Sequence, residues 1–229
     1  MQATQTMAVY RSSIGKKAIM ALTGLIGVGF VLFHMYGNLK VFQGPEYFNL
    51  YAEGLRSIGA PIFSHTHLLW VGRIVLLLAV VLHVWAAVSL TRQARKARSS
   101  KYAVTRRVHA DYASITMRYG GTVLFFFILF HLMHFTWGVS AVHSDFIPGD
   151  AYHNVVSGFQ FLPSVIVYLI AVTALGFHLY HGTWSMFQTL GLLNRKYDRP
   201  VRLLGLALAL VIAVGFSLVP LGVAFGLVQ

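Results

Sequence analysis

The segment FHLYHGTWS, residues 177–185, places His178 and His181 inside an otherwise apolar run. Ionisable side chains are expensive to keep in a membrane-spanning helix, and there they usually mark a functional site. Three other apolar runs contain histidines in the same way: FVLFHMYGN around His34, VVLHVWAA around His83, and FILFHLMHFTW around His131 and His134. The chain is therefore organised around histidines on four apolar segments.

The composition is that of a membrane protein. Of the 229 residues, 57% are hydrophobic and 10% are charged, and the mean hydropathy of +0.67 is far from that of a soluble domain. The chain contains no cysteine, which excludes disulfides, iron–sulfur ligation and thiolate haem ligation within it. A metal held by this chain would need His, Met or oxygen ligands.

Five apolar runs are long enough to cross the roughly 30 Å hydrocarbon core of a membrane as helices. They occupy residues 14–37, 67–90, 115–140, 161–190 and 201–227. The expected fold is therefore an all-α membrane protein, a bundle of five transmembrane helices that forms one membrane domain over residues 1–229. A signal peptide is disfavoured because the first run is long, contains His34 and is not followed by a clear cleavage site of small residues.

Basic residues indicate the orientation of the bundle. They gather before the first run, between the second and third runs, and between the fourth and fifth runs. The positive-inside rule places these segments in the cytoplasm, so we expect the N-terminus inside and the C-terminus outside. The formal net charge of +12 then reflects topology and anionic lipid rather than nucleic-acid binding. In the first outer loop, the segment FNLYAEGLRS is expected to form a short interfacial helix.

This topology allows the depth of each histidine to be estimated. At about 1.5 Å per residue from the inner boundary, His34 lies about 25 Å up its helix and His131 about 24 Å up its own. On the descending helices, His83 lies roughly 13 Å deep and His178 roughly 15–20 Å deep. The four histidines therefore form an outer and an inner layer, which differ in depth by on the order of 10 Å.

Two histidines at equal depth on different helices can bind one iron axially from opposite faces, as in helix bundles that hold a b-type haem. The sequence therefore predicts two stacked haems b, one between His34 and His131 and one between His83 and His178. Gly27 before His34 and Gly182 after His178 leave room for a porphyrin. Any one of these histidines taken alone could instead be a structural hydrogen-bond donor between helices.

Other polar residues have less certain roles. His134 and His181 follow a predicted ligand by three residues and face a similar direction, so spacing leaves each as an alternative ligand or a contact of a propionate or quinone. Arg73 is expected to pair with a propionate of the outer haem and Arg118 with one of the inner haem; snorkelling to the interface is the alternative. Surface positions in water are expected for His65, His67, His109, His143 and His153.

In order and with this topology, these residues resemble a known family. They are similar to the single-chain, di-haem cytochrome b subunit of bacterial succinate dehydrogenase and fumarate reductase, the type with five transmembrane helices in one polypeptide. The resemblance covers nearly the whole chain and selects His131 over His134 and His178 over His181. It rests on H-x3-N at His34 and Asn38, on His83, on R-x12-H at Arg118 and His131, and on F-H-x3-G-x-W-S at residues 177–185 followed by Gly191.

The resemblance implies a membrane anchor and electron-transfer subunit of a succinate:quinone oxidoreductase in the bacterial cytoplasmic membrane. Its partners would be a flavoprotein subunit that oxidises succinate and an iron–sulfur subunit docked on the cytoplasmic face. Electrons would pass through two haems b to a quinone, which we expect to be menaquinone, and the complex could form a higher-order oligomer. The chain is not expected to oxidise succinate by itself.

One position departs from the family pattern. Some fumarate reductases of this type carry a glutamate two residues before the fourth-span ligand for transmembrane proton transfer, and here that position is Gly176. Near the outer haem, Glu46 and Glu53 are then the acidic candidates for proton exchange, and Glu53 is preferred because its segment is helical. The alternatives are a cytochrome b subunit of a hydrogenase or formate dehydrogenase, or a haem-free proton-coupled transporter.

Overall fold

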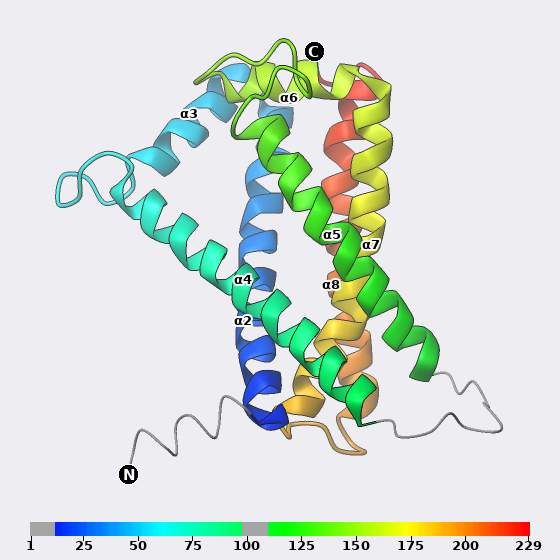
Figure 1. The fold of residues 1–229 in the computed structure, drawn as a ribbon. Coiled ribbons are helices and arrows are strands. Elements are labelled where there is room, and N and C mark those ends of the chain that lie inside the picture. The colour runs from blue at the N-terminus through cyan, green and yellow to red at the C-terminus, as the bar shows by residue number, and fades with distance from the viewer. Residues whose placement is uncertain (1–11, 98–109) are drawn as a thin grey trace.

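The computed structural model describes residues 12–97 and 110–229, and in these ranges all regular structure is helical (Figure 1). Five of the helices described are long and apolar enough to cross a membrane, which confirms the predicted number of spans. Residues 98–109, with His109 and part of the predicted basic loop, lie outside the described ranges. The elements are α2 Ser13–Leu39, η1 Lys40–Gln43, α3 Pro45–Arg56, α4 His67–Lys96, α5 Ala110–Phe135, α6 Ala151–Gln160, α7 Leu162–Thr189 and α8 Asp198–Ala224.

Several helix ends differ from the predicted spans, and those of α4, α5 and α8 differ by three residues or more. α5 stops at Phe135 rather than at residue 140, because the chain turns at Gly138, whose φ is +58°. α8 stops at Ala224 rather than at residue 227, where Gly226 adopts a φ of +71°. α4 continues to Lys96 instead of ending at residue 90, because Arg and Lys are good helix formers and suit the negative end of the helix dipole.

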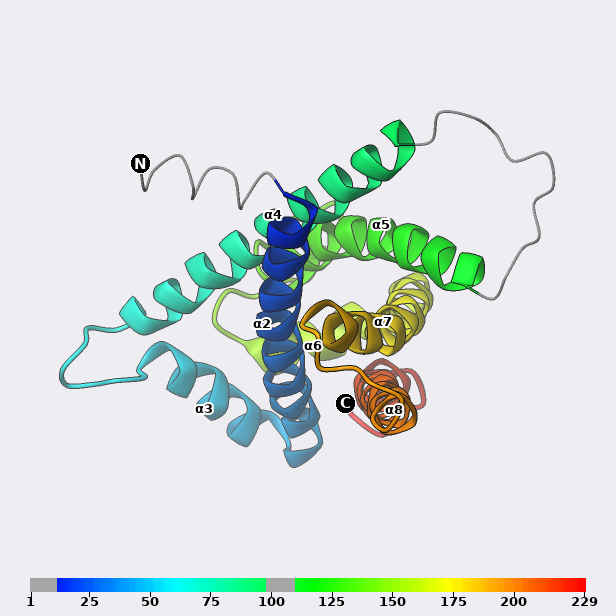
Figure 2. The same ribbon diagram turned by 90° about the horizontal axis from the view of Figure 1, so that it is seen from below.

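The five transmembrane helices form one bundle, in which α2 and α7 each contact three of the others. α7 and α8 form a close antiparallel pair, in which a Cβ built on Gly205 would lie 2.9 Å from the backbone oxygen of Tyr180. α2 packs against α4, α7 and α8, and α5 packs against α7. Figure 2 shows α2 between α4 and the pair of α7 and α8. This arrangement surrounds the histidines with α2, α4, α5 and α7.

Two short helices lie at one end of the bundle, where α6 runs across it and α3 slopes outward toward the start of α4 (Figure 1). α3 forms where the segment FNLYAEGLRS predicted a short helix, whereas α6 was not predicted. Asn49 of α3 joins them, since its side chain donates to Asp150 Oδ1 at 3.0 Å and accepts from the backbone N–H of Tyr152 at 2.9 Å. The buried core at this end includes Phe48 of α3 and Phe159 of α6.

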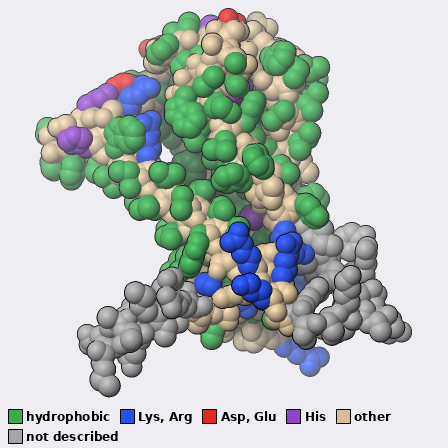
Figure 3. Space-filling model, in the orientation of Figure 1, with side chains coloured by type: hydrophobic (Ala, Val, Ile, Leu, Met, Phe, Trp, Pro, Cys, Tyr) green, Lys and Arg blue, Asp and Glu red, His purple; other side chains and the backbone are tan. Residues whose placement is uncertain are grey.

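The opposite end of the bundle is rich in basic side chains. Figure 3 shows most of the visible Lys and Arg side chains near that end, while the visible Asp and Glu side chains lie toward α3 and α6. We call the end with α3 and α6 the capped end and the opposite end the basic end. The described basic side chains that define the basic end are Lys16, Lys17, Arg92, Arg95, Lys96, Arg195, Lys196, Arg199 and Arg202.

Candidate functional site

The structure brings four span histidines together in two pairs. The ring centres of His34 on α2 and His131 on α5 lie 5.7 Å apart. Those of His83 on α4 and His178 on α7 lie 6.2 Å apart. These are the pairs that the estimated depths predict, and we call them the capped-end pair and the basic-end pair, respectively.

The separation within each pair suits two ligands on opposite sides of one metal. An imidazole nitrogen lies about 2.0–2.1 Å from a bound metal ion and the ring centre about 1 Å beyond it, so two opposed rings have centres about 6 Å apart. Among the described residues, no group of three or more His, Cys, Asp or Glu side chains could hold a bare ion. Two protein ligands fit a haem, because the porphyrin supplies the other ligands to the iron.

Glycines lie directly against the basic-end pair. A Cβ built on Gly24 of α2 would lie 3.5 Å from His83 Cε1, and one built on Gly121 of α5 would lie 3.7 Å from His178 Cε1. Gly27 and Gly182, which the sequence predicts to leave room for a porphyrin, do not contact these rings, and their role stays a prediction. A Cβ on Gly27 would have no neighbour within 4 Å, and one on Gly182 would meet the Met117 methyl group at 3.9 Å.

The two rings of the basic-end pair differ in their hydrogen bonds. His83 Nδ1 lies 3.1 Å from the hydroxyl of Thr23 on α2. His178 Nδ1 is buried and has no hydrogen-bond partner in the described part of the chain. A buried polar atom without a partner costs about 1–3 kcal/mol, and it commonly indicates that a water, an ion or a bound group belongs nearby.

The capped-end pair is linked to a tyrosine that the sequence analysis did not single out. The hydroxyl of Tyr168 on α7 lies 3.0 Å from His131 Nδ1 and 3.1 Å from His134 Nδ1. A buried tyrosine hydroxyl usually has a hydrogen-bond partner, so the position of Tyr168 within a predicted span was the signal that could have identified it. Aromatic rings surround the three residues: Phe127, Phe130, Phe135 and Phe159.

His143 corrects one expectation from the sequence. It was expected to be a surface histidine, but only 5% of it is exposed. Its Nδ1 lies 3.0 Å from the backbone oxygen of His134, and its Nε2 lies 2.9 Å from the Ser157 hydroxyl of α6. The expectation was wrong because the second outer loop folds over the bundle as α6 and covers this side chain.

The remaining candidate residues lie away from the paired rings or at the surface. Arg73 is exposed over the ring of Trp70, with its guanidinium carbon 5.0 Å from the ring centre. Arg118 is exposed on α5 and His181 is partly exposed on α7. Their roles toward propionates or a quinone remain predictions.

Glu53 is exposed on α3 and paired with two side chains. Its carboxylate lies 2.7 Å from His65 Nε2 and 2.9 Å from Arg56 Nη1. The hydrogen bond with His65, followed by that with Arg56, lowers the pKa of Glu53. His65 and His67 are exposed, and the Nε2 of His153 lies 3.0 Å from the backbone oxygen of Asp145.

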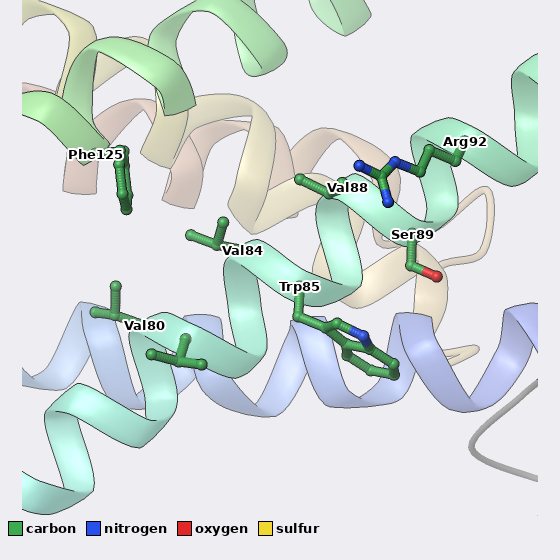
Figure 4. Close-up of a pocket in the computed structure, with 8 residues that line it drawn as sticks. Val80, Val84, Trp85, Val88, Ser89, Arg92 and Phe125 are labelled. Carbon is green, nitrogen blue, oxygen red and sulfur yellow. The ribbon is translucent and has the colours of Figure 1, made fainter.

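A cavity of about 390 Å³ lies between α4 and α5 and contains none of the histidines. In Figure 4, Phe125 projects from α5 toward the side of α4 that carries Val80 and Val84. Ser89 and Arg92 line the same cavity and provide its polar groups along with the Trp85 indole. The cavity is therefore mainly apolar, with a cation toward the basic end.

Comparison with family models gave a match to residues 92–216, under the description succinate dehydrogenase/fumarate reductase transmembrane subunit. The matched segment is more than half of the chain and contains His131 and His178, whereas His34 and His83 precede it. Comparisons with curated proteins and with solved structures gave no significant match.

Proposed function

The chain belongs to the family of succinate dehydrogenase/fumarate reductase transmembrane subunits, and on this basis we propose that it holds two haems b between its paired histidines. It is a multi-pass membrane-anchor subunit of such a complex. His83 and His178 would hold one haem, and His34 and His131 the other. The observation that best supports this assignment is the spacing of the two pairs, 6.2 and 5.7 Å between ring centres.

When bound, haem supplies one-electron transfer between the soluble subunits and a quinone. The chain would contribute the imidazole ligands, the glycines that let the rings of the basic-end pair lie against α2 and α5, and apolar side chains around the group. The buried Nδ1 of His178, without a protein partner, supports a bound group beside the basic-end pair.

The family implies a flavoprotein subunit and an iron–sulfur subunit as partners. We place the iron–sulfur subunit at the basic end, because the positive-inside rule puts the basic segments in the cytoplasm. The basic-end pair would then lie nearer to the electron donor and the capped-end pair nearer to the opposite surface. Menaquinone as the acceptor and a bacterial cytoplasmic membrane are parts of this proposal.

Proton exchange at the capped end would need a group that binds protons near neutral pH. Glu53 is a weak candidate for this role, since the lowered pKa of its carboxyl means that it accepts a proton only at acid pH. His134, which lies beside Tyr168 and His131, is the other candidate at this end. His181 would be the corresponding candidate near the basic end.

The test is an optical difference spectrum of the complex isolated gently from membranes that contain all its subunits. The proposal expects a b-type signal, about two haems per chain by extraction, and reduction of a large share of it by succinate. The identity of the co-purified soluble subunits separates this reading from a hydrogenase or formate dehydrogenase cytochrome. Absence of visible absorption would contradict the proposal and favour a haem-free proton-coupled transporter.

A further inference from the structure

In each pair, one histidine places its Nδ1 beside a hydroxyl group from a different helix. His83 of α4 meets Thr23 of α2 at 3.1 Å, and His131 of α5 meets Tyr168 of α7 at 3.0 Å. A neutral imidazole carries its proton on one of its two nitrogens, and only the other can bind a metal. What the hydroxyl group does at Nδ1 therefore decides whether Nε2 is available as a ligand.

Thr23 acts as an acceptor toward His83. Its hydroxyl donates to the backbone oxygen of Ile19 at 2.7 Å, with Met20 O also within reach at 3.2 Å. Because a hydroxyl has a single proton, a Thr23 hydroxyl that donates to Ile19 O accepts a hydrogen bond from His83 Nδ1. Accepting from His83 requires a proton on His83 Nδ1, and so leaves Nε2 unprotonated.

The single hydroxyl of Tyr168 has one proton and cannot donate it to both of its histidines. Its hydroxyl is within hydrogen-bond distance of Nδ1 of both His131 and His134. Both hydrogen bonds can form at once if the hydroxyl oxygen accepts the N–H of one ring and the hydroxyl proton is donated to the bare nitrogen of the other. If the Tyr168 hydroxyl accepts from His131 Nδ1–H, then His131 Nε2 carries no proton. His134 then accepts at Nδ1 and carries its proton on its own Nε2. His131 is also the ring that faces His34, with centres 5.7 Å apart.

We propose that Thr23 and Tyr168 are positioning residues that select Nε2 of His83 and of His131 as the ligating nitrogens, and that Tyr168 thereby makes His131 rather than His134 the ligand. This inference rests on the proposed function, because it concerns the histidines assigned to the haems. An acceptor at Nδ1–H also makes an imidazole more basic toward the metal, which favours the oxidised iron. Each hydroxyl therefore holds down the midpoint potential of one haem.

The first test compares Thr23→Val with Thr23→Ser in the complete complex, by redox titration of the haem absorption. Valine keeps the shape and loses the acceptor, so it is expected to raise the potential of the basic-end haem alone and to weaken its retention about 10–100-fold. Serine keeps the hydroxyl and is expected to preserve both properties. The matched control is Thr173→Val on α7, where the hydroxyl bonds only to its own helix at Leu169 O, 2.8 Å away.

The second test uses Tyr168→Phe, which keeps the ring and removes the hydroxyl. It is expected to raise the potential of the capped-end haem and to leave the basic-end haem unchanged. Tyr152→Phe is the control at the same end, since the Tyr152 hydroxyl donates to the backbone oxygen of Gln229 at 3.0 Å. His134→Ala is expected to retain both haems, because His134 is a partner of Tyr168 and not a ligand.

The inference is overturned if neither potential moves in Thr23→Val and Tyr168→Phe, if both haems shift equally, or if His134→Ala loses the capped-end haem. If Thr23→Val does not assemble, Thr23→Ala is used, and an unchanged potential there also overturns the role of Thr23. A complex that contains no haem before any substitution contradicts the proposed function itself. A complex with two haems and unmoved potentials contradicts only the selection by Thr23 and Tyr168.

Discussion

The capped end and the basic end of the bundle are built by different means. At the capped end, α3 and α6 cover the bundle, and Tyr168 lies in a core of aromatic rings. At the basic end, His178 Nδ1 has no partner among the described residues, and Lys16 is 7% exposed with no carboxylate of the described residues in an ion pair with it. The described residues close the capped end by their own contacts, whereas at the basic end they leave His178 Nδ1 without a partner.

The largest expected effect separates the two ends by the haems that we propose for them. Replacing His83 or His178 by Ala should abolish binding of the basic-end haem, because that haem loses one of its two protein ligands, and should largely spare the other haem. Replacing His34 or His131 by Ala should do the converse. Haem content per complex and redox titration measure this, with His67→Ala, an exposed position, as the control. Retention of both haems in all four variants would contradict the assignment.

The next effect tests whether the capped end has its own folded core. Phe159 of α6 is 4% exposed in this core, whereas Phe161, two residues later, is 62% exposed. Phe159→Ala is expected to lower the free energy of unfolding by about 3–5 kcal/mol through lost packing, while Phe161→Ala should change it by about 0.5 kcal/mol or less. Thermal unfolding in detergent measures both, and equal effects would show that α6 is not a packed cap.

A smaller effect is expected where α7 and α8 approach closely. A Cβ on Gly205 would lie 2.9 Å from the backbone oxygen of Tyr180, which cannot move away without shifting α7. Gly205→Ala should therefore destabilise the pair by about 1–3 kcal/mol. Gly54→Ala on α3 has no neighbour within 4 Å of the new methyl group and should stabilise the protein by about 0.5–1 kcal/mol. The same thermal assay distinguishes them, and a stabilised Gly205→Ala would refute the close packing.

The smallest effect concerns pH at the capped end. The backbone N–H of His153 and then the side-chain amide of Asn49 lower the pKa of Asp150, which caps α6. The ionised Asp150 carboxylate therefore makes its full contribution to the free energy of unfolding above the ordinary Asp pKa of about 4. That contribution is lost as pH falls through the lowered pKa. Its size is about 1 kcal/mol or less, as for other helix caps.

Hydrogen exchange of the α6 amides is the measurement that checks this effect. Protection of α6 should fall below about pH 4, and Asp150→Asn, which keeps a capping oxygen but does not titrate, should reduce that fall. An equal loss of protection in the variant and the unaltered protein would assign the acid sensitivity to other groups, such as the pair of Glu53 and His65.

Several parts of the fold were predictable because they depend on local properties of the chain. The number of spans follows from runs of apolar residues, and the depth of a residue follows from the constant rise of a helix. These two quantities were enough to pair His34 with His131 and His83 with His178 before any contact was known. The helix α3 was also predictable, since its polar and apolar residues alternate with helical spacing.

Other parts were not predictable, because they depend on how helices rotate about their axes and on which loop covers which end. Gly24 and Gly121 lie against the rings of His83 and His178, and these contacts were not predicted because hydropathy does not set the rotation of a helix. The helix α6 is only ten residues long, too short to be recognised as a span, so the burial of His143 beneath it was missed.

The sequence by itself determined that this chain is a membrane bundle with histidines in two layers, because hydrophobic length and helical rise are properties of each segment alone. Only the tertiary structure decided which hydroxyl group meets which imidazole and which glycine meets which ring. Those contacts join residues of different helices, such as Thr23 with His83 and Tyr168 with His131. They exist only once packing has fixed the rotation and tilt of each helix.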